Sequence, residues 1–266
     1  MNAFIVPRVR RASDRTLFGR AVPTILEGGA ADWPAVHRWT WSWLRRRAGA
    51  VRVPVRSPDG GRRARRLESV IRRFSSRDYI VDWTFCCDAP DLAADVRTPH
   101  FAMWDWMNSV PERVRPVLRW LYIGGAGTGS SLHQDVLGTH AWLAQLRGRK
   151  DWVLYPPDTF TAAEAATHDA FSRGAEATDS LARRTRWVAE LCPGDVIFVP
   201  SLWWHQVQNP GPSMGLTGNF VNESNYSRVR DEAARGRFRA IVPYLDAVAA
   251  RRRAPRSTCE NRLSRA

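Results

Sequence analysis

The second half of the chain is a succession of short apolar runs separated by glycine, proline and aspartate. From residue 118 onward these runs are rich in β-branched and aromatic residues, and an alanine-rich stretch at 158–186, which we expect to be helical, interrupts them. Many short strands at close spacing are typical of a β-sandwich or β-barrel. The runs are RWLYIGG, SLHQD, AWLAQLRG, DWVLYP, RWVAELC, DVIFVP, HQVQN and GLTGNFV. We therefore predict an all-β core over residues 118–225.

The first 117 residues predict an α/β elaboration packed on that core. Strand-like runs alternate there with patterns of helical apolar spacing. Strands are expected at 22–28, 51–55 and 78–83, helices at 40–50 and 67–76, and mixed helix and loop at 85–117. The basic stretch 56–66 contains Gly60-Gly61 and predicts a loop or the tip of a hairpin.

The end of the chain predicts helical additions. Residues 226–254 have the pattern of two helices broken near Gly236 or Pro243, and these helices could supply a homodimer surface. Residues 255–266 are expected to form a disordered tail, as the last residues of a domain often do.

Charge and cysteine content narrow the classes of function. The net charge is +14, and such a charge attracts nucleic acid or other polyanions. The arginines come in short clusters, however, and such clusters also occur on solvated faces. Nucleic-acid binding is therefore a possible role and not the favoured one. The four cysteines have no zinc-ligand spacing. The apolar runs are far shorter than the ~18 residues of a membrane span, and the N-terminus has no apolar signal-peptide centre. We therefore expect a cytoplasmic protein with no membrane partner.

Three residues have the pattern of a metal site. His133 and Asp135 are two apart in SLHQD, and alternate residues of a strand share a face. His205 follows a separate apolar run, PGDVIFVPSLWW. Each signal alone is weak, because chance gives such a pair often and because a histidine can simply pack in a core. Two histidines and a carboxylate leave open coordination positions and suit the Fe(II) of non-haem oxygenases, whereas zinc more often recruits a further histidine or cysteine.

The chain contains a single lysine, Lys150, among its 40 lysine and arginine residues, and this lysine stands directly before the run DWVLYP, 17 residues after His133. An Fe(II) oxygenase of this kind needs a co-substrate, commonly 2-oxoglutarate, whose far carboxylate requires a cation. Lys150 offers a compact charge on a flexible stem, for which the planar fork of arginine is a poor substitute. The alternative is a surface lysine at a Gly-Arg-Lys turn.

Two blocks of the sequence resemble a known family. HQDVLGTHAWLAQLRGRKDWVLYPP and GDVIFVPSLWWHQVQN are similar to the metal-and-lysine block and the distal-histidine block of the JmjC and cupin-like 2-oxoglutarate oxygenases, in the branch of the JmjC lysyl hydroxylase also described as an arginine demethylase. The resemblance extends over residues 22–222. It implies a double-stranded β-helix, the jelly roll of the cupin and JmjC type.

The resemblance also implies roles for individual residues. His133, Asp135 and His205 match the iron ligands, which are also the catalytic centre. Residues that match binders of 2-oxoglutarate or flank the site are Lys150, Thr217, Tyr79, Ser130 and Asn219. For the last three, ordinary polar strand residues remain an alternative. Leu143 replaces an asparagine of the lysyl hydroxylase, which puts the side wall of the pocket and the substrate analogy in doubt.

The implied activity is hydroxylation of a C–H bond with Fe(II), 2-oxoglutarate and O₂, releasing succinate and CO₂. An amino-acid side chain, in a protein, a peptide or a natural-product precursor, is the favoured substrate. Two alternatives stay open: an RNA-modifying oxygenase, for which the net charge predicts a salt-sensitive affinity for RNA, and a catalytically silent cupin that binds a ligand.

Overall fold

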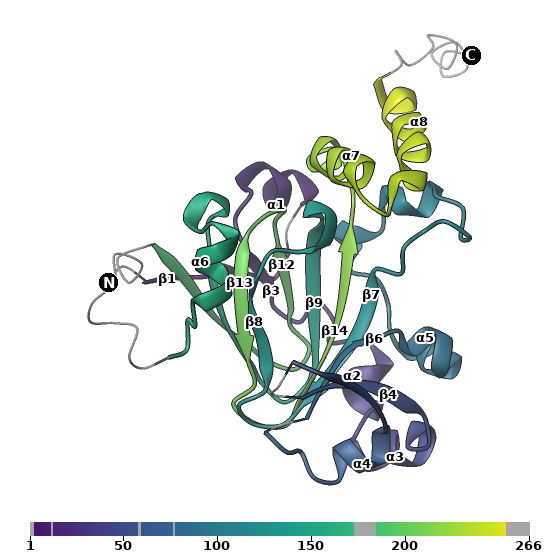
Figure 1. The fold of residues 1–266 in the computed structure, drawn as a ribbon, viewed down its shortest axis with the longest axis vertical. Helices are drawn as coiled ribbons and strands as arrows, with labels where there is room; N and C mark the ends of the chain where they lie inside the picture. Colours follow the sequence, from purple (N-terminus) through teal and green to yellow (C-terminus); the bar gives the residue numbers. More distant parts are fainter. Residues whose placement is uncertain (1–2, 12, 58–59, 77, 173–184, 254–266) are drawn as a thin grey trace, which may run out of the picture.

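Two β-sheets pack face to face in the computed structural model, which describes residues 3–11, 13–57, 60–76, 78–172 and 185–253 (Figure 1). One sheet has the strand order β1-β11-β10-β13-β8, and the other has the order β2-β3-β12-β9-β14-β7-β6-β4-β5. The strands are β1 (Ala3–Ile5), β2 (Arg8–Val9), β3 (Thr24–Leu26), β4 (Arg52–Arg56), β5 (Arg62–Arg66), β6 (Tyr79–Trp83), β7 (Arg119–Gly124), β8 (Gly129–His133), β9 (His140–Arg147), β10 (Lys150–Tyr155), β11 (Arg186–Leu191), β12 (Val196–Val199), β13 (Trp204–Gln208) and β14 (Ser213–Phe220).

The eight strands β7 to β14 form the jelly roll that the sequence predicts. Four of them lie in each sheet, and neighbours within each set of four pair antiparallel. Each of the eight apolar runs becomes one strand, because alternate residues of each run face the space between the sheets. The fold is therefore an all-β core with helical additions, as predicted.

The N-terminal third of the chain widens both sheets. Strands β2 and β3 continue the nine-stranded sheet at one end, β6, β4 and β5 continue it at the other, and β1 joins the smaller sheet beside β11 (Figure 1). The basic stretch 56–66 is the hairpin of the two predicted alternatives, with its turn closed by the hydrogen bond from Ser57 N–H to the Gly61 carbonyl oxygen. Its residues 62–66, however, are not part of the tip: they form strand β5, which pairs antiparallel with β4 from Arg52↔Arg66 to Arg56↔Arg62. Charged side chains suit such an edge strand, because they discourage pairing with further chains.

The helices are short and lie mainly outside the sheets. The α-helices are α1 (Asp14–Arg20), α2 (Pro34–Arg38), α3 (Trp41–Ala48), α4 (Leu67–Ile71), α5 (Phe85–Asp88), α6 (Ala162–Thr167), α7 (Tyr226–Arg235) and α8 (Val242–Arg253); the 3₁₀ helices include η3 (Trp106–Ser109), η4 (Val136–Gly138) and η7 (Arg239–Ile241). Helix α4 ends earlier than predicted, and α6 confirms only the start of the predicted helical insertion, whose residues 173–184 lie outside the described part of the chain.

The two predicted C-terminal helices are present. Helix α7 ends at Arg235, before Gly236, and Pro243 lies in the first turn of α8, where its missing N–H costs nothing. Their buried residues pack with Trp106 and Val221 in one apolar cluster. The homodimer through these helices stays a prediction, and the predicted tail at 255–266 lies outside the described residues. Among the described residues no helix has the length and hydropathy to cross a membrane.

The core is continuous between the N-terminal third and the jelly roll. One apolar cluster joins Trp39, Trp83 and Phe85 from the first hundred residues to Phe198 and Leu216 from the core strands. Each of these five side chains is fully buried. The N-terminal elements therefore share a core with the strands that carry the candidate site.

Gly129 allows strands β8 and β13 to approach closely beside the site. A Cβ added there would lie 1.9 Å from the carbonyl oxygen of Val207, a backbone atom that cannot turn away. We expect Gly129→Ala to lower the free energy of unfolding by about 3 kcal/mol, as for other overpacked positions. Urea denaturation monitored by tryptophan fluorescence measures this change. Gly211→Ala is the control, because a Cβ at Gly211 meets no atom within 4 Å; equal stability of the two variants would contradict the close approach.

Candidate active site

Three metal-binding side chains meet at one end of the smaller sheet. His133 is the last residue of β8, His205 is the second residue of β13, and the two are paired directly across the strands. Asp135 lies beyond the end of β8, so it reaches the site from the turn that precedes η4 and not from a continuing strand. The ligand atoms of the three residues all lie within 4.8 Å of one another. The predicted His–Asp–His constellation is therefore assembled.

Both histidines present the same ring nitrogen to this centre. Nδ1 of His133 lies 2.7 Å from the carbonyl oxygen of Ser131, and Nδ1 of His205 lies 3.0 Å from that of Trp203. A carbonyl oxygen can only accept, so each Nδ1 carries the proton and donates it. In the neutral ring Nε2 then keeps a free lone pair, which is the arrangement that orients a histidine ligand toward a metal.

Burial keeps His205 in its neutral form. Its side chain is 6% exposed, and desolvation together with the neighbouring His133 lowers the pKa of His205 to about 4. Its Nε2 lies 3.8 Å from Oδ2 of Asp135, too far for a hydrogen bond. At neutral pH His205 therefore offers an uncharged imidazole, as metal coordination requires.

Lys150 lies in the interior between the sheets. It is 1% exposed, which excludes the alternative of a surface lysine at a turn. Its Nζ donates to Oδ1 of Asn209 at 2.7 Å and approaches the hydroxyl oxygen of Tyr79 at 3.4 Å, and no carboxylate of the described residues lies within ion-pair distance. Burial lowers the pKa of Lys150 to about 7. A buried cation without a counter-ion is costly, so this position favours an anionic ligand.

One inner cavity brings all eight predicted site residues together. Its walls include the three candidate ligands and, besides them, Lys150, Tyr79, Ser130, Thr217 and Asn219. Leu143 also lines it, so the residue that departs from the lysyl hydroxylase forms part of the wall.

The other predicted polar residues differ in what they contact. Asn219 donates from Nδ2 to Oδ1 of Asp135 at 3.0 Å and therefore orients that carboxylate. The hydroxyl of Thr217 donates to the carbonyl oxygen of Trp142 at 2.7 Å. Burial raises the pKa of Tyr79, while a hydrogen bond with Ser130 opposes this shift. Both Tyr79 and Ser130 thus stay neutral hydrogen-bonding groups in the cavity.

Two further residues of the site escaped the sequence analysis. Asn209 accepts the hydrogen bond of Lys150 and donates to the hydroxyl of Thr128, and it follows His205 by four residues. Trp152 follows Lys150 by two, and its ring centroid lies 5.7 Å from that of His205. The alternation of side chains along a strand could have found Trp152, which shares β10 with Lys150. Asn209 lies just beyond the end of β13, where a strand period gives no signal.

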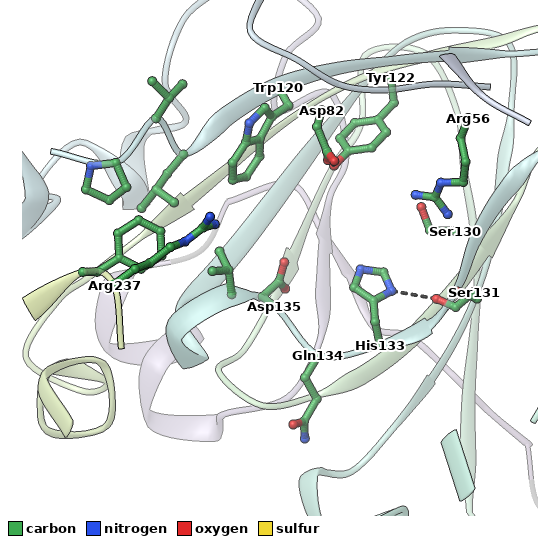
Figure 2. Close-up of a pocket in the computed structure, with 15 residues that line it drawn as sticks. Arg56, Asp82, Trp120, Tyr122, Ser130, Ser131, His133, Gln134, Asp135 and Arg237 are labelled. Carbon is green, nitrogen blue, oxygen red and sulfur yellow. Dashed lines mark hydrogen bonds between the residues drawn. The ribbon is translucent and has the colours of Figure 1, made fainter. Parts of the chain in front are cut away.

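A larger outer cavity of about 810 Å³ opens from the same residues (Figure 2). Its floor includes His133 and Asp135, and one wall carries Trp120 and Tyr122, two apart on β7. Asp82 lines the same wall, and its backbone has a left-handed φ of 52° where β6 bulges against β7. Since Trp120 and Tyr122 line both cavities, a bound molecule can extend from the outer cavity to the three candidate ligands.

The residues present fit a metal ion and an acidic co-substrate. Two buried polar atoms in the inner cavity have no hydrogen-bond partner in the described part of the chain: Oδ1 of Asn219 and Nε1 of Trp152. Buried polar atoms are normally paired, so a missing partner marks a place where a ligand or water belongs. With two imidazoles, one carboxylate and an uncompensated lysine beside them, the cavity could hold a divalent metal and a dicarboxylate.

The chain is similar to proteins that are named as demethylases, as a lysyl-hydroxylase or as an oxygenase. It is 33% identical over 80% of its length to "Lysine-specific demethylase JMJ21" of Arabidopsis thaliana, covering 25% of that protein. It is 30% identical over 81% to "Bifunctional arginine demethylase and lysyl-hydroxylase psr-1" of Caenorhabditis briggsae, covering 60% of it. It is 29% identical over 57% to "2-oxoglutarate and iron-dependent oxygenase JMJD4" of Homo sapiens, covering 38%. The chain thus spans between a quarter and three fifths of these relatives.

A family model agrees with the fold and the site. The model described as "Cupin-like domain" matches residues 87–226, which include every core strand and all three candidate ligands. This confirms the family that the two sequence blocks resemble. With its jelly roll, its His–Asp–His centre and its JmjC-type relatives, the chain belongs to the cupin-like domain family.

Proposed function

We propose that this protein is an Fe(II)- and 2-oxoglutarate-dependent hydroxylase that acts on a C–H bond of an amino-acid side chain in a protein or peptide. The observation that carries the proposal is the presence, in one cavity, of a His–Asp–His centre and a buried lysine without a carboxylate partner among the described residues. A relative named as a 2-oxoglutarate and iron-dependent oxygenase supports the same cofactors.

Fe(II), 2-oxoglutarate and O₂, when bound, supply the oxidation that inserts one oxygen atom into the C–H bond, with succinate and CO₂ as co-products. His133, His205 and Asp135 would hold the metal, and the backbone carbonyls behind the two histidines keep each Nε2 turned toward it. Lys150 would bind the far carboxylate of 2-oxoglutarate, with Asn209 holding the ammonium in place. The buried walls keep water away from the reacting atoms.

Two observations favour a peptide substrate. The outer cavity, at about 810 Å³, has room for an amino-acid side chain and neighbouring backbone beside the candidate ligands. Relatives are named for their action on lysyl and arginyl residues. An RNA substrate is the second candidate, since the net charge of +14 attracts polyanions.

The experiment is an incubation of the purified protein with Fe(II), 2-oxoglutarate and isotopically labelled O₂, together with a synthetic peptide library or, in parallel, a pool of RNA oligonucleotides. Mass spectrometry of the products should find one labelled oxygen atom in a subset of peptides, accompanied by succinate. The His133→Ala variant is the control and should give neither product. Labelled RNA with unlabelled peptides would favour the second candidate, and succinate absent under all conditions would contradict the proposal.

The lowered pKa of Lys150 predicts how 2-oxoglutarate binding depends on pH. A free lysine loses its proton near pH 10.4, but Lys150 of the ligand-free protein loses it at about pH 7 because it is buried. The dicarboxylate needs the charged ammonium, so above this pH binding must take up a proton. Affinity should fall as the pH rises above about 7, by at most about tenfold per unit.

Calorimetric titration of 2-oxoglutarate into the Mn(II)-loaded protein between about pH 6.5 and about pH 8.5 measures this dependence, and buffers of different ionisation enthalpy report the proton uptake. The Lys150→Ala variant should show neither the slope nor the proton uptake. An affinity that rises with pH in the wild-type protein would contradict a lysine of lowered pKa as the anchor.

A further inference from the structure

Two arginines face the outer cavity from different parts of the fold. Arg56 is the last residue of β4, and Arg237 lies between α7 and η7, yet both line this cavity together with His133 and Asp135. Figure 2 shows Arg237 and Arg56 on opposite sides of the opening, with the two candidate ligands between them. A molecule bound in this cavity beside the candidate ligands therefore has a guanidinium group on either side.

Neither arginine is neutralised by its surroundings. Arg56 is half-buried and Arg237 is exposed, and no carboxylate of the described residues lies within ion-pair distance of either. Cζ of Arg237 lies 4.7 Å from the ring centroid of Phe238. The acid on the adjacent wall is already engaged: Asp82 accepts from the Tyr122 hydroxyl at 2.7 Å and from Arg62 at 2.6 Å. Its charge is matched by Arg62, which does not line the cavity.

The charges of the loaded site leave this pair uncompensated. In the proposed function the site holds a metal dication, the Asp135 carboxylate, dianionic 2-oxoglutarate and the Lys150 ammonium. The charges of these four groups sum to zero. Asp82 and Arg62 cancel as well. The loaded outer cavity then carries two net positive charges, both at its opening, and such a cavity attracts an anion and disfavours a cation.

The positive lining continues past this cavity. A second cavity of about 600 Å³ shares Pro116 and Leu118 with the first and is also lined by arginine: Arg115, Arg119 and Arg97, of which Arg97 pairs with Asp32. Nε of Arg119 is buried without a hydrogen-bond partner among the described residues. The acid of this cavity, Asp105, uses Oδ1 to accept from the backbone N–H groups of Met107 and Val221. Cationic groups therefore border a path longer than one side chain.

We infer that the substrate is a peptide segment rich in glutamate and aspartate, whose acidic residues flank the hydroxylated residue and contact Arg56 and Arg237. The inference rests on the proposed function and narrows it to one class of peptide. This substrate is negatively charged, whereas the lysyl and arginyl residues in the names of the relatives are positively charged. Acidic peptide is favoured over RNA because the two arginines of this cavity lie on opposite sides of it, which suits separate carboxylates better than a continuous phosphate backbone.

Fluorescence anisotropy with two synthetic peptides tests the inference. Both are twelve-residue, fluorescein-labelled alanine–serine–glycine peptides, one carrying four glutamates and the other four lysines in the same positions. They are titrated with wild-type protein loaded with Mn(II) and 2-oxoglutarate under nitrogen. The acidic peptide should bind at least about tenfold more tightly than the basic one, and less tightly as salt rises from about 0.05 M to about 0.5 M.

Charge-neutralising variants show whether the two arginines cause the preference. Arg56→Gln and Arg237→Gln should each weaken acidic-peptide binding about fivefold, and the double variant about 20-fold, which is the range of partly exposed ion pairs. The matched controls are Arg52→Gln, on the same strand as Arg56, and Arg239→Gln, two residues after Arg237; neither residue lines the cavity, and both variants should bind like wild type.

Equal binding of the two peptides, tighter binding of the basic peptide, or an equal loss in the controls would overturn the inference. A labelled twelve-nucleotide oligouridylate is titrated in parallel. If it binds more tightly than the acidic peptide and loses affinity in the same two variants, the inference is overturned in favour of nucleic acid. Succinate release by the wild-type protein separates this failure from that of the proposed function: succinate without acidic-peptide preference overturns the inference alone, and absence of succinate contradicts the function itself.

Discussion

Replacing His205 with alanine is expected to abolish Fe(II)-dependent formation of succinate from 2-oxoglutarate. The substitution removes one of three donor groups from a centre whose ligand atoms lie within 4.8 Å of one another. Loss of an outer hydrogen-bonding partner alone typically costs 10- to 100-fold in metal affinity, so loss of a ligand should cost more than about 100-fold. His133→Ala should behave in the same way, because the two rings pair across β8 and β13.

Metal affinity is measured by titrating Fe(II) or Mn(II) into each variant without oxygen, and succinate is quantified by chromatography. His37→Ala is the control, since His37 is an exposed residue that contacts the carbonyl oxygen of Ala31. It should keep both properties. If metal binding and turnover are unchanged in both His133→Ala and His205→Ala, the assignment of these histidines as metal ligands is contradicted.

Replacing Lys150 with alanine should weaken 2-oxoglutarate binding by a few hundred-fold. Loss of one partner of a buried ionic contact typically costs ~3–5 kcal/mol, and about 1.4 kcal/mol corresponds to a factor of ten. Metal binding and thermal unfolding should stay close to wild type, because Nζ contacts Asn209 and Tyr79 and none of the three candidate ligands. Titration calorimetry with the Mn(II)-loaded proteins measures the difference.

The Lys150→Arg variant separates charge from shape. It keeps a positive charge but brings a longer, planar group into a cavity already bounded by Tyr79 and Thr217, so it should recover only part of the affinity. Full recovery would mean that any cation suffices. Equal affinity of the wild-type protein and Lys150→Ala would show that this lysine has no part in co-substrate binding.

The predictions that held are those that depend on local alternation. Each apolar run between residues 118 and 222 became one strand, because a two-residue period fixes which face of a strand is buried. Lys150, by contrast, lies between the sheets within reach of Tyr79, which precedes it by 71 residues. The sequence pattern alone could not show that contact; the resemblance to a family with a known fold supplied it.

The features that were missed depend on tertiary context. The arginines of β5 have no apolar alternation, and this strand exists because β4 offers it a paired edge. Asp135 enters the site from a turn in which Leu137 and Gly138 have positive φ, and no strand period describes such a turn. Arg56 and Arg237 lie far apart in the sequence, so the charge of the outer cavity became visible only when β4 and the segment after α7 met around it.

The most direct test of the account is the release of succinate from 2-oxoglutarate by the wild-type protein with and without Fe(II), in the presence of O₂ and no added substrate. We expect slow turnover that requires Fe(II), is absent in His205→Ala, and in Lys150→Ala needs far higher concentrations of 2-oxoglutarate. A protein that binds Fe(II) at the His133, Asp135 and His205 centre but releases no succinate at any 2-oxoglutarate concentration would contradict it, leaving a cupin that binds a ligand without turning it over.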